Sequence, residues 1–142
     1  MRANSPALYL LRSLPAANLA NTRGRRTWEW KMPDGTQISV YFRHRGERFA
    51  SHFHKGEDPS KNPEHLLLIT GTACMDILDQ HGNERQETLV ADGPTPVELV
   101  IQPWVLHRMQ ALENCIYIEY RPAYFDPLHP DTYPACQFPY RF

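Results

Sequence analysis

Alternation of apolar and polar side chains is the main pattern of this chain from residue 27 onward. Ile38, Val40 and Phe42 alternate with polar residues. Because successive side chains of a β-strand point to opposite faces, this period of two predicts a half-buried strand. Further segments of strand type, separated by turn residues, cover 50–54, 66–69, 73–78, 85–90, 97–102, 105–111 and 116–120. Many short strands and no convincing central helix predict an all-β barrel or sandwich.

Two interruptions shape the predicted strands. Residues 55–63 are polar and contain Gly56, Pro59 and Pro63, which predicts a loop. Gly71 interrupts the next apolar segment, so separate strands are expected before and after it. The predicted barrel therefore has a polar insertion after residue 54 and a strand break at residue 71.

The composition changes at both ends of the predicted barrel. Residues 1–26 are expected to form an N-terminal leader that packs on the barrel or a partner, 27–121 the barrel, and 122–142 an extended C-terminal tail. Five prolines exclude a regular helix or central strand from the tail: Pro122, Pro127, Pro130, Pro134 and Pro139. Its aromatic residues are atypical of disorder: Tyr124, Phe125, Tyr133, Phe138, Tyr140 and Phe142. We therefore expect the tail to pack on the barrel or across the interface of a homodimer.

Length and charge narrow the class of protein. A chain of 142 residues suits one domain with a substantial core. The formal net charge of −1 gives no basic footprint for nucleic acid, and no apolar stretch approaches the roughly 20 residues that span a bilayer. Arg12 interrupts the N-terminal apolar run, which argues against a signal peptide. Three cysteines without a C-x-x-C spacing indicate reduced thiols in a cytoplasmic protein.

Histidines and a carboxylate provide a candidate metal site. His52 and His54 are two residues apart, so in a strand both imidazoles lie on one face. His107 and a carboxylate, from Glu64 or Glu57, could complete a set of four ligands. Three imidazole nitrogens and one carboxylate suit a divalent first-row metal with open positions for water or substrate. Glu64 is preferred, because Glu57 stands among turn-forming residues of the predicted loop.

The spacing of these residues resembles that of the cupin superfamily, whose first motif is G-x5-H-x-H-x3–4-E-x6-G. Gly46, His52, His54, Glu64 and Gly71 follow the order of this motif. Nine residues, rather than three or four, separate the second histidine from the glutamate. An insertion in the connecting loop, over the polar segment 55–63, explains the difference.

The second cupin motif, G-x5-P-x-G-x2-H-x3-N, is matched less fully. Pro103 precedes His107, but Val105 replaces the glycine between them and the asparagine is absent. The resemblance covers about residues 37–120 and implies a single-domain cupin barrel, a double-stranded β-helix or jelly roll, similar to small RmlC-like cupins. It also implies that one divalent metal ion (Fe, Mn, Ni, Co or Zn) is coordinated by His52, His54, Glu64 and His107.

The segment 115–121 carries the candidate catalytic side chains. Cys115, Tyr117, Glu119 and Arg121 share one strand face, opposite an aliphatic face. The pattern leaves open which face lines the interior, because the aliphatic set suits an ordinary core equally well. If the polar set is inside, Tyr117 and Glu119 are candidates for proton transfer.

Function is the least determined property, because one fold serves many activities. The resemblance favours a metal-dependent enzyme, either a dioxygenase or an isomerase or epimerase, acting on a small polar substrate such as a sugar. Lys55 or Lys61 of the predicted loop is expected to contact an anionic substrate. Two alternatives stay open: a metal-free nucleotide-sugar epimerase, and a non-enzymatic barrel that binds or senses a small ligand. No nucleic-acid or membrane partner is expected.

Overall fold

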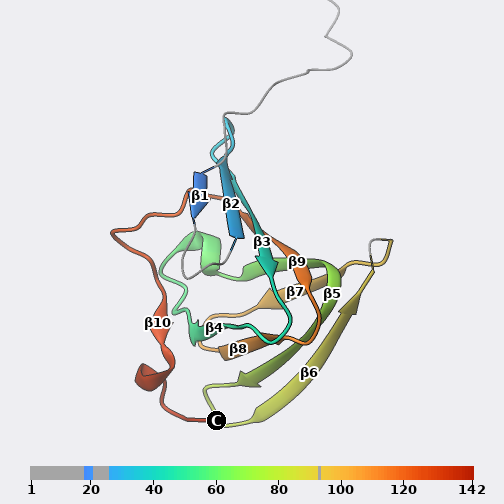
Figure 1. The fold of residues 1–142 in the computed structure, drawn as a ribbon. Coiled ribbons are helices and arrows are strands. Elements are labelled where there is room, and N and C mark those ends of the chain that lie inside the picture. The colour runs from blue at the N-terminus through green and yellow to red at the C-terminus, as the bar shows by residue number, and fades with distance from the viewer. Residues whose placement is uncertain (1–17, 21–25, 93) are drawn as a thin grey trace, which may run out of the picture.

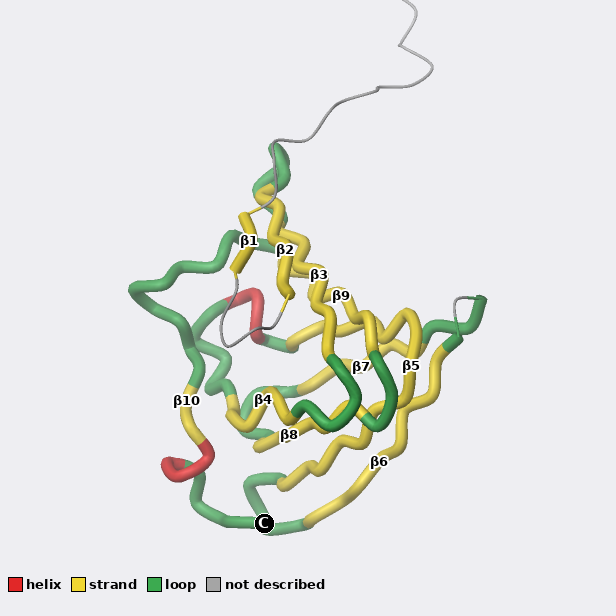
Figure 2. The backbone as a smooth tube through the Cα atoms, viewed as in Figure 1, coloured by secondary structure: helices red, strands yellow, loops and turns green. Residues whose placement is uncertain are grey.

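The structure is a computed structural model that describes residues 18–20, 26–92 and 94–142. No α-helix occurs among these residues, whose strands curl around a common interior (Figures 1 and 2). The prediction of an all-β barrel is therefore confirmed. The elements in chain order are β1 (Asn18–Ala20), β2 (Arg26–Lys31), β3 (Gln37–Arg43), β4 (Arg48–Phe53), the 3₁₀-helix η1 (Pro59–Lys61), β5 (Glu64–Leu78), β6 (Glu84–Ala91), β7 (Val97–Ile101), β8 (Leu106–Ala111), β9 (Cys115–Arg121), β10 (Tyr133–Pro134) and the 3₁₀-helix η2 (Ala135–Gln137).

The long strand β5 joins the two halves of the barrel. The main path of the antiparallel sheet is β1-β2-β3-β9-β5-β8-β4-β10, and β6 and β7 also pair with β5. Residues 64–70 of β5 pair with β7 and β9, whereas residues 71–78 pair with β6 and β8. The sheet therefore folds over itself along β5, which curves through the barrel in Figure 1.

Gly71 is the point at which β5 passes from one half to the other. The predicted strand break at this residue is wrong, because β5 continues through it. Gly71 has a φ of 102°, a conformation that strains residues with a side chain. A Cβ atom here would overlap the carbonyl oxygen of Asn114 and lie 2.9 Å from Cα of Cys115. The glycine thus allows the strand to bend without ending.

Replacing Gly71 by alanine is expected to lower the free energy of unfolding by about 2–4 kcal/mol, because backbone strain and steric overlap add. Gly35→Ala is the matched control. Gly35 has a φ of 90° but no heavy atom within 4 Å of its Cβ position, so we expect a loss of only about 1 kcal/mol there. Urea denaturation of both variants measures the difference. Equal losses would contradict the steric role of Gly71.

Polar side chains line the barrel interior along the neighbouring strands β3 and β9. In β3, Gln37, Ser39 and Arg43 are buried, and the apolar residues between them are only half-buried. Phe42 packs edge-on against Trp28 instead, with ring centroids 4.7 Å apart. In β9 the polar face is also the inner one, which answers the question left open by its sequence: Cys115, Tyr117, Glu119 and Arg121 are buried.

The C-terminal tail packs on the barrel beside β4. Tyr133 of β10 stands opposite Phe53 of β4 in an antiparallel pair. Phe138 is buried and joins Phe53, Leu78 and Leu106 in a compact apolar cluster. The tail therefore covers the strand that carries the first candidate histidine.

Residues 18–20 of the predicted leader form β1, which pairs with β2, and Arg26 is the first residue of β2. The leader's other residues, 1–17 and 21–25, lie outside the described part of the chain. Within the described ranges, no helix is both long and apolar enough to cross a membrane. Cys74, Cys115 and Cys136 are free thiols.

Candidate metal centre

A β-bulge in β4 determines where His52 points. The register between β4 and β8 shifts by one residue between Phe49 and His52, which places His52 opposite His107. Ala50, inside the bulge, has a left-handed φ of 56°. Without the extra residue, the side chain before His52 would stand opposite His107, and His52 would face away.

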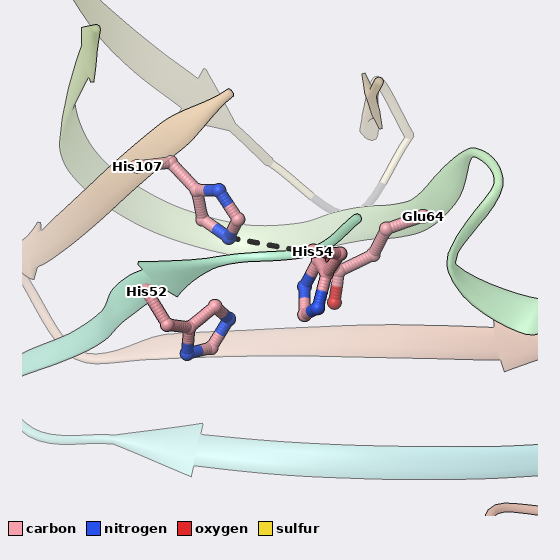
Figure 3. Close-up of side chains that lie close together, drawn as sticks. All are labelled: His52, His54, Glu64 and His107. Atoms are coloured by element: carbon pink, nitrogen blue, oxygen red, sulfur yellow. Dashed lines mark hydrogen bonds and ion pairs between the residues drawn. The ribbon is translucent and has the colours of Figure 1, made fainter. Parts of the chain in front are cut away.

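The four side chains expected to bind metal lie together inside the barrel, as Figure 3 shows. One nitrogen or oxygen from each of His52, His54, Glu64 and His107 lies within 4.8 Å of the others. His52 is half-buried, and the other three side chains are buried. Because they come from the end of β4 and the residue that follows it, the start of β5 and the start of β8, long-range folding assembles the cluster.

Glu57, the alternative carboxylate, lies outside this cluster. Its side chain is exposed and accepts a hydrogen bond of 2.8 Å from the hydroxyl of Tyr133. By contrast, Oε2 of Glu64 lies 2.9 Å from Nε2 of His54 and 3.5 Å from Nε2 of His107. The structure thus brings Glu64, and not Glu57, beside the histidines.

Main-chain carbonyls orient two of the three imidazoles. Nδ1 of His54 lies 2.7 Å from the carbonyl oxygen of Asp131, and Nδ1 of His107 lies 3.0 Å from that of Val105. Since a carbonyl can only accept, each Nδ1 carries a proton, and each Nε2 is the nitrogen that faces Glu64. Metal-binding histidines are held in this way, with the second ring nitrogen donating to a carbonyl or carboxylate.

The atoms that face the centre of the cluster fit a bound cation. Nε2 of His107 is buried and has no hydrogen-bond partner among the described residues. Nε2 of His54 and Oε2 of Glu64 are both acceptors when Nδ1 of His54 donates, yet they lie only 2.9 Å apart. A proton or a metal ion between them relieves this repulsion. Three imidazole nitrogens and one carboxylate are a donor set that divalent first-row metals accept.

Electrostatics keep the cluster in the protonation states that metals bind. Burial, together with the charges of His107 and His54, lowers the pKa of His52 from 6.5 to about 3. Burial also lowers the pKa of His107. Burial alone would raise the pKa of Glu64, but a hydrogen bond donated by His54 to its carboxylate and the charge of Lys61 lower it well below its usual value. At neutral pH His52 and His107 are therefore neutral and Glu64 is ionised, as metal binding requires.

Lys61 belongs to the interior of the site and not to its mouth. Its side chain is 4% exposed, because η1 folds the inserted segment back onto the barrel. Its Nζ lies 2.6 Å from Oε1 of Glu64 and 2.9 Å from Oε1 of Glu119. Lys61 thereby links the carboxylate of the cluster to the candidate catalytic glutamate.

Glu119 and Tyr117, the candidate catalytic residues, lie beside the cluster. Oε2 of Glu119 accepts a hydrogen bond of 3.1 Å from the hydroxyl of Tyr41, and Oε1 lies 2.5 Å from Nε of Arg121. Burial, followed by the charge of Glu119, raises the pKa of Tyr41 well above its usual value, so the phenol stays protonated. Tyr117 stacks on Tyr41 with ring centroids 4.6 Å apart. The sequence marks Tyr41 only as an aromatic residue that could shape the mouth of a pocket, and its bond to Glu119 was not predicted.

A cavity of about 350 Å³ lies against the cluster. Its walls include the polar side chains of His52, Glu64 and Glu119 and the apolar side chains of Leu66 and Met109. This volume is at the lower end of the range of small-molecule sites. The cluster therefore faces a space that a small molecule can enter.

Asp131 supports the cluster from the C-terminal tail and was not identified from the sequence. Its buried carboxylate accepts hydrogen bonds of 2.8, 3.0 and 3.0 Å from the main-chain N–H groups of Lys55, Gly56 and Asp58. Its own carbonyl accepts from Nδ1 of His54. One residue thus holds both the inserted segment and the orientation of an imidazole.

Asp131→Ala is expected to lower the free energy of unfolding by about 2–4 kcal/mol, because three main-chain donors lose a charged acceptor. Metal affinity is expected to fall about 10- to 100-fold, because the carboxylate no longer anchors residues 55–58 and the main-chain carbonyl that orients His54 is less firmly placed. Asp131 has a left-handed φ of 43°. Asp131→Asn retains a side-chain oxygen and tolerates this conformation, so it serves as the milder control. Urea denaturation and metal titration against a chelator measure the two effects. Unchanged metal affinity in Asp131→Ala would contradict the positioning role.

Neither a protein-family model nor a curated protein matches this sequence. Solved structures do match the fold. The chain is similar to CapF from Staphylococcus aureus, a capsular polysaccharide assembling protein, at 23% identity over 86% of this chain and 33% of that chain, with a TM-score of 0.67. It is similar to the oxalate decarboxylase of Bacillus subtilis, which has Mn(II) centres, at 14% identity over 74% and 27%, with a TM-score of 0.55. It is also similar to the CENP-C cupin domain of Drosophila melanogaster, at 11% identity over 74% of each chain, with a TM-score of 0.57. The chain spans about a third of the length of CapF.

Proposed function

We propose that this protein, which has the cupin fold, is a metal-dependent enzyme acting on a small polar molecule. In this proposal His52, His54, Glu64 and His107 hold one divalent first-row metal ion. The observation that carries the proposal is the orientation of the cluster. Two Nε2 atoms converge on a buried carboxylate beside a cavity of about 350 Å³.

The bound ion would supply Lewis-acid polarisation of a substrate oxygen or, with Fe or Mn, electron transfer. The chain's own residues hold the ion and place a proton relay beside it. The relay runs from the hydroxyl of Tyr41 to Glu119, and Lys61 connects Glu119 with Glu64. In our proposal Glu119 accepts a proton at Oε2, and Tyr117 lines the path to that atom.

The alternative of a metal-free nucleotide-sugar epimerase has less support. Such enzymes have a related fold, but their catalysis relies on a histidine that acts with an aspartate and a tyrosine. Here the three histidines converge on one another and on Glu64, and the nearest link to an aspartate is the main-chain carbonyl of Asp131. The donor set therefore favours a metal centre.

Water exchange on the Mn(II)-loaded protein tests whether the centre is open, as an enzyme requires, or closed, as a structural site would be. We expect the relaxation rate of water protons to be enhanced by the loaded protein, because the cavity side of the centre admits solvent. The metal-free protein with an equal amount of a closed Mn(II) chelate is the control. Stoichiometric Mn(II) without enhancement would indicate a structural ion and would contradict the proposed enzyme.

A further inference from the structure

Arg43 is a buried cation of the same cavity that the proposed relay does not use. It is the last residue of β3, opposite Cys115 of β9, and its side chain points inward. Only 7% of its surface is exposed. It lines the cavity together with His52 and Glu64, so it faces the same space as the metal centre.

Aromatic rings hold this guanidinium without neutralising it. Its Cζ lies 5.2 Å from the ring centre of Tyr41, 5.4 Å from that of Phe49 and 5.7 Å from that of Tyr117. These rings carry no charge, so they contact the guanidinium without supplying a counter-ion. Nη1 donates a hydrogen bond of 2.9 Å to the carbonyl oxygen of Phe42, whereas Nε has no hydrogen-bond partner in the described part of the chain.

The other cations of the cavity are already paired. Lys61 contacts Glu64 and Glu119, and Arg121 lies 2.5 Å from Glu119. None of the ion pairs found among the described residues includes Arg43. A buried charge without a counter-ion is unfavourable. An anion that enters the cavity would therefore be stabilised beside Arg43.

We propose that the substrate is a small carboxylic acid whose carboxylate is bound by Arg43 while a second oxygen of the same molecule reaches the metal centre. This inference rests on the proposed function, because it uses the metal centre as the second anchor. A guanidinium with free in-plane donors binds a planar carboxylate through two parallel hydrogen bonds. Leu66 and Met109 line the cavity as well, and they suit a short carbon chain between the two polar groups.

Calorimetric titration of the Mn(II)-loaded protein with the diacids malonate, succinate and glutarate tests this proposal, with acetate as the single-carboxylate probe. We expect the best-fitting diacid to bind more tightly than acetate. Arg43→Met should weaken the binding of that diacid about 10- to 100-fold, the usual range for a charge-assisted hydrogen bond. The binding of acetate should change less than about threefold, because acetate can occupy the metal centre alone.

Arg45→Met is the matched control, because Arg45 is exposed two residues away and its loss removes the same charge from the surface. Arg43→Gln provides a second neutral variant if Arg43→Met does not fold. An equal preference for the diacid in the wild type and in a folded Arg43 variant would overturn the proposal. Failure to bind Mn(II), measured before any acid is added, would instead overturn the proposed function. The two failures are therefore distinguishable.

Discussion

Replacing Lys61 by methionine is expected to lower the free energy of unfolding of the metal-free protein by about 3–5 kcal/mol, the range for breaking a buried ion pair. Nζ of Lys61 lies 2.6 Å from Glu64 and 2.9 Å from Glu119, and all three side chains are buried. Methionine fills a similar volume but carries no charge. The variant therefore leaves Glu64 without a cation, and Glu119 retains only Arg121 at short distance.

A divalent ion should reverse much of this loss. The positive charge of Lys61 lies beside Glu64 and repels a cation bound to the same carboxylate, so metal affinity is expected to rise in Lys61→Met. Urea denaturation with and without saturating Mn(II) measures both effects, because a ligand that binds only the folded state stabilises it. Lys31→Met, at an exposed position, should change stability by less than about 1 kcal/mol. A Lys61→Met protein as stable as the wild type without metal would contradict the role of this residue.

Glu64→Gln is expected to weaken divalent-metal affinity at least about 100-fold, whereas Glu57→Gln should change it less than about twofold. The amide keeps the shape of Glu64 but removes the negative charge that balances the ion, and loss of a buried charge partner is worth several kcal/mol. Glu57 is exposed and bonded to Tyr133. Competition with a chelator of known affinity measures both variants.

The sequence left both glutamates open as the carboxylate ligand. The metal affinities of the two variants distinguish directly between them. Circular dichroism of each variant establishes that the fold is retained. The assignment fails if Glu57→Gln releases the metal while Glu64→Gln keeps it. Equal affinity in all three proteins would place the metal elsewhere in the chain.

Much of the fold and of the candidate site could be predicted from local sequence patterns. The period of two identified the strands, and the H-x-H spacing placed His52 and His54 in one strand region. Residues two apart share a strand face, so the burial of Glu64, Leu66 and Leu68 follows the expected parity. These features depend on neighbours in the sequence, which a single sequence displays.

Features created by distant segments could not be predicted in this way. The bulge at Ala50 aligns His52 with His107. Its left-handed residue is an alanine and not a glycine, so the sequence gives no signal for a bulge there. Asp131 orients His54 across 77 residues of sequence. Tyr41 and Arg43 of β3 line the cavity, and the buried Gln37 and Ser39 share their face of the strand, so the apolar face of this strand does not identify the interior.

Elemental analysis of the protein purified without added metal, beside the variant His52→Ala/His107→Ala, tests the central claim most directly. We expect about one divalent first-row metal ion per folded wild-type chain and none in the variant, because two of the four proposed ligands are gone while the fold-defining strands remain. Reconstitution with Fe(II) or Mn(II) should give the same stoichiometry. A wild-type protein that binds no metal even after reconstitution, or a variant that keeps its metal, would contradict the proposed centre.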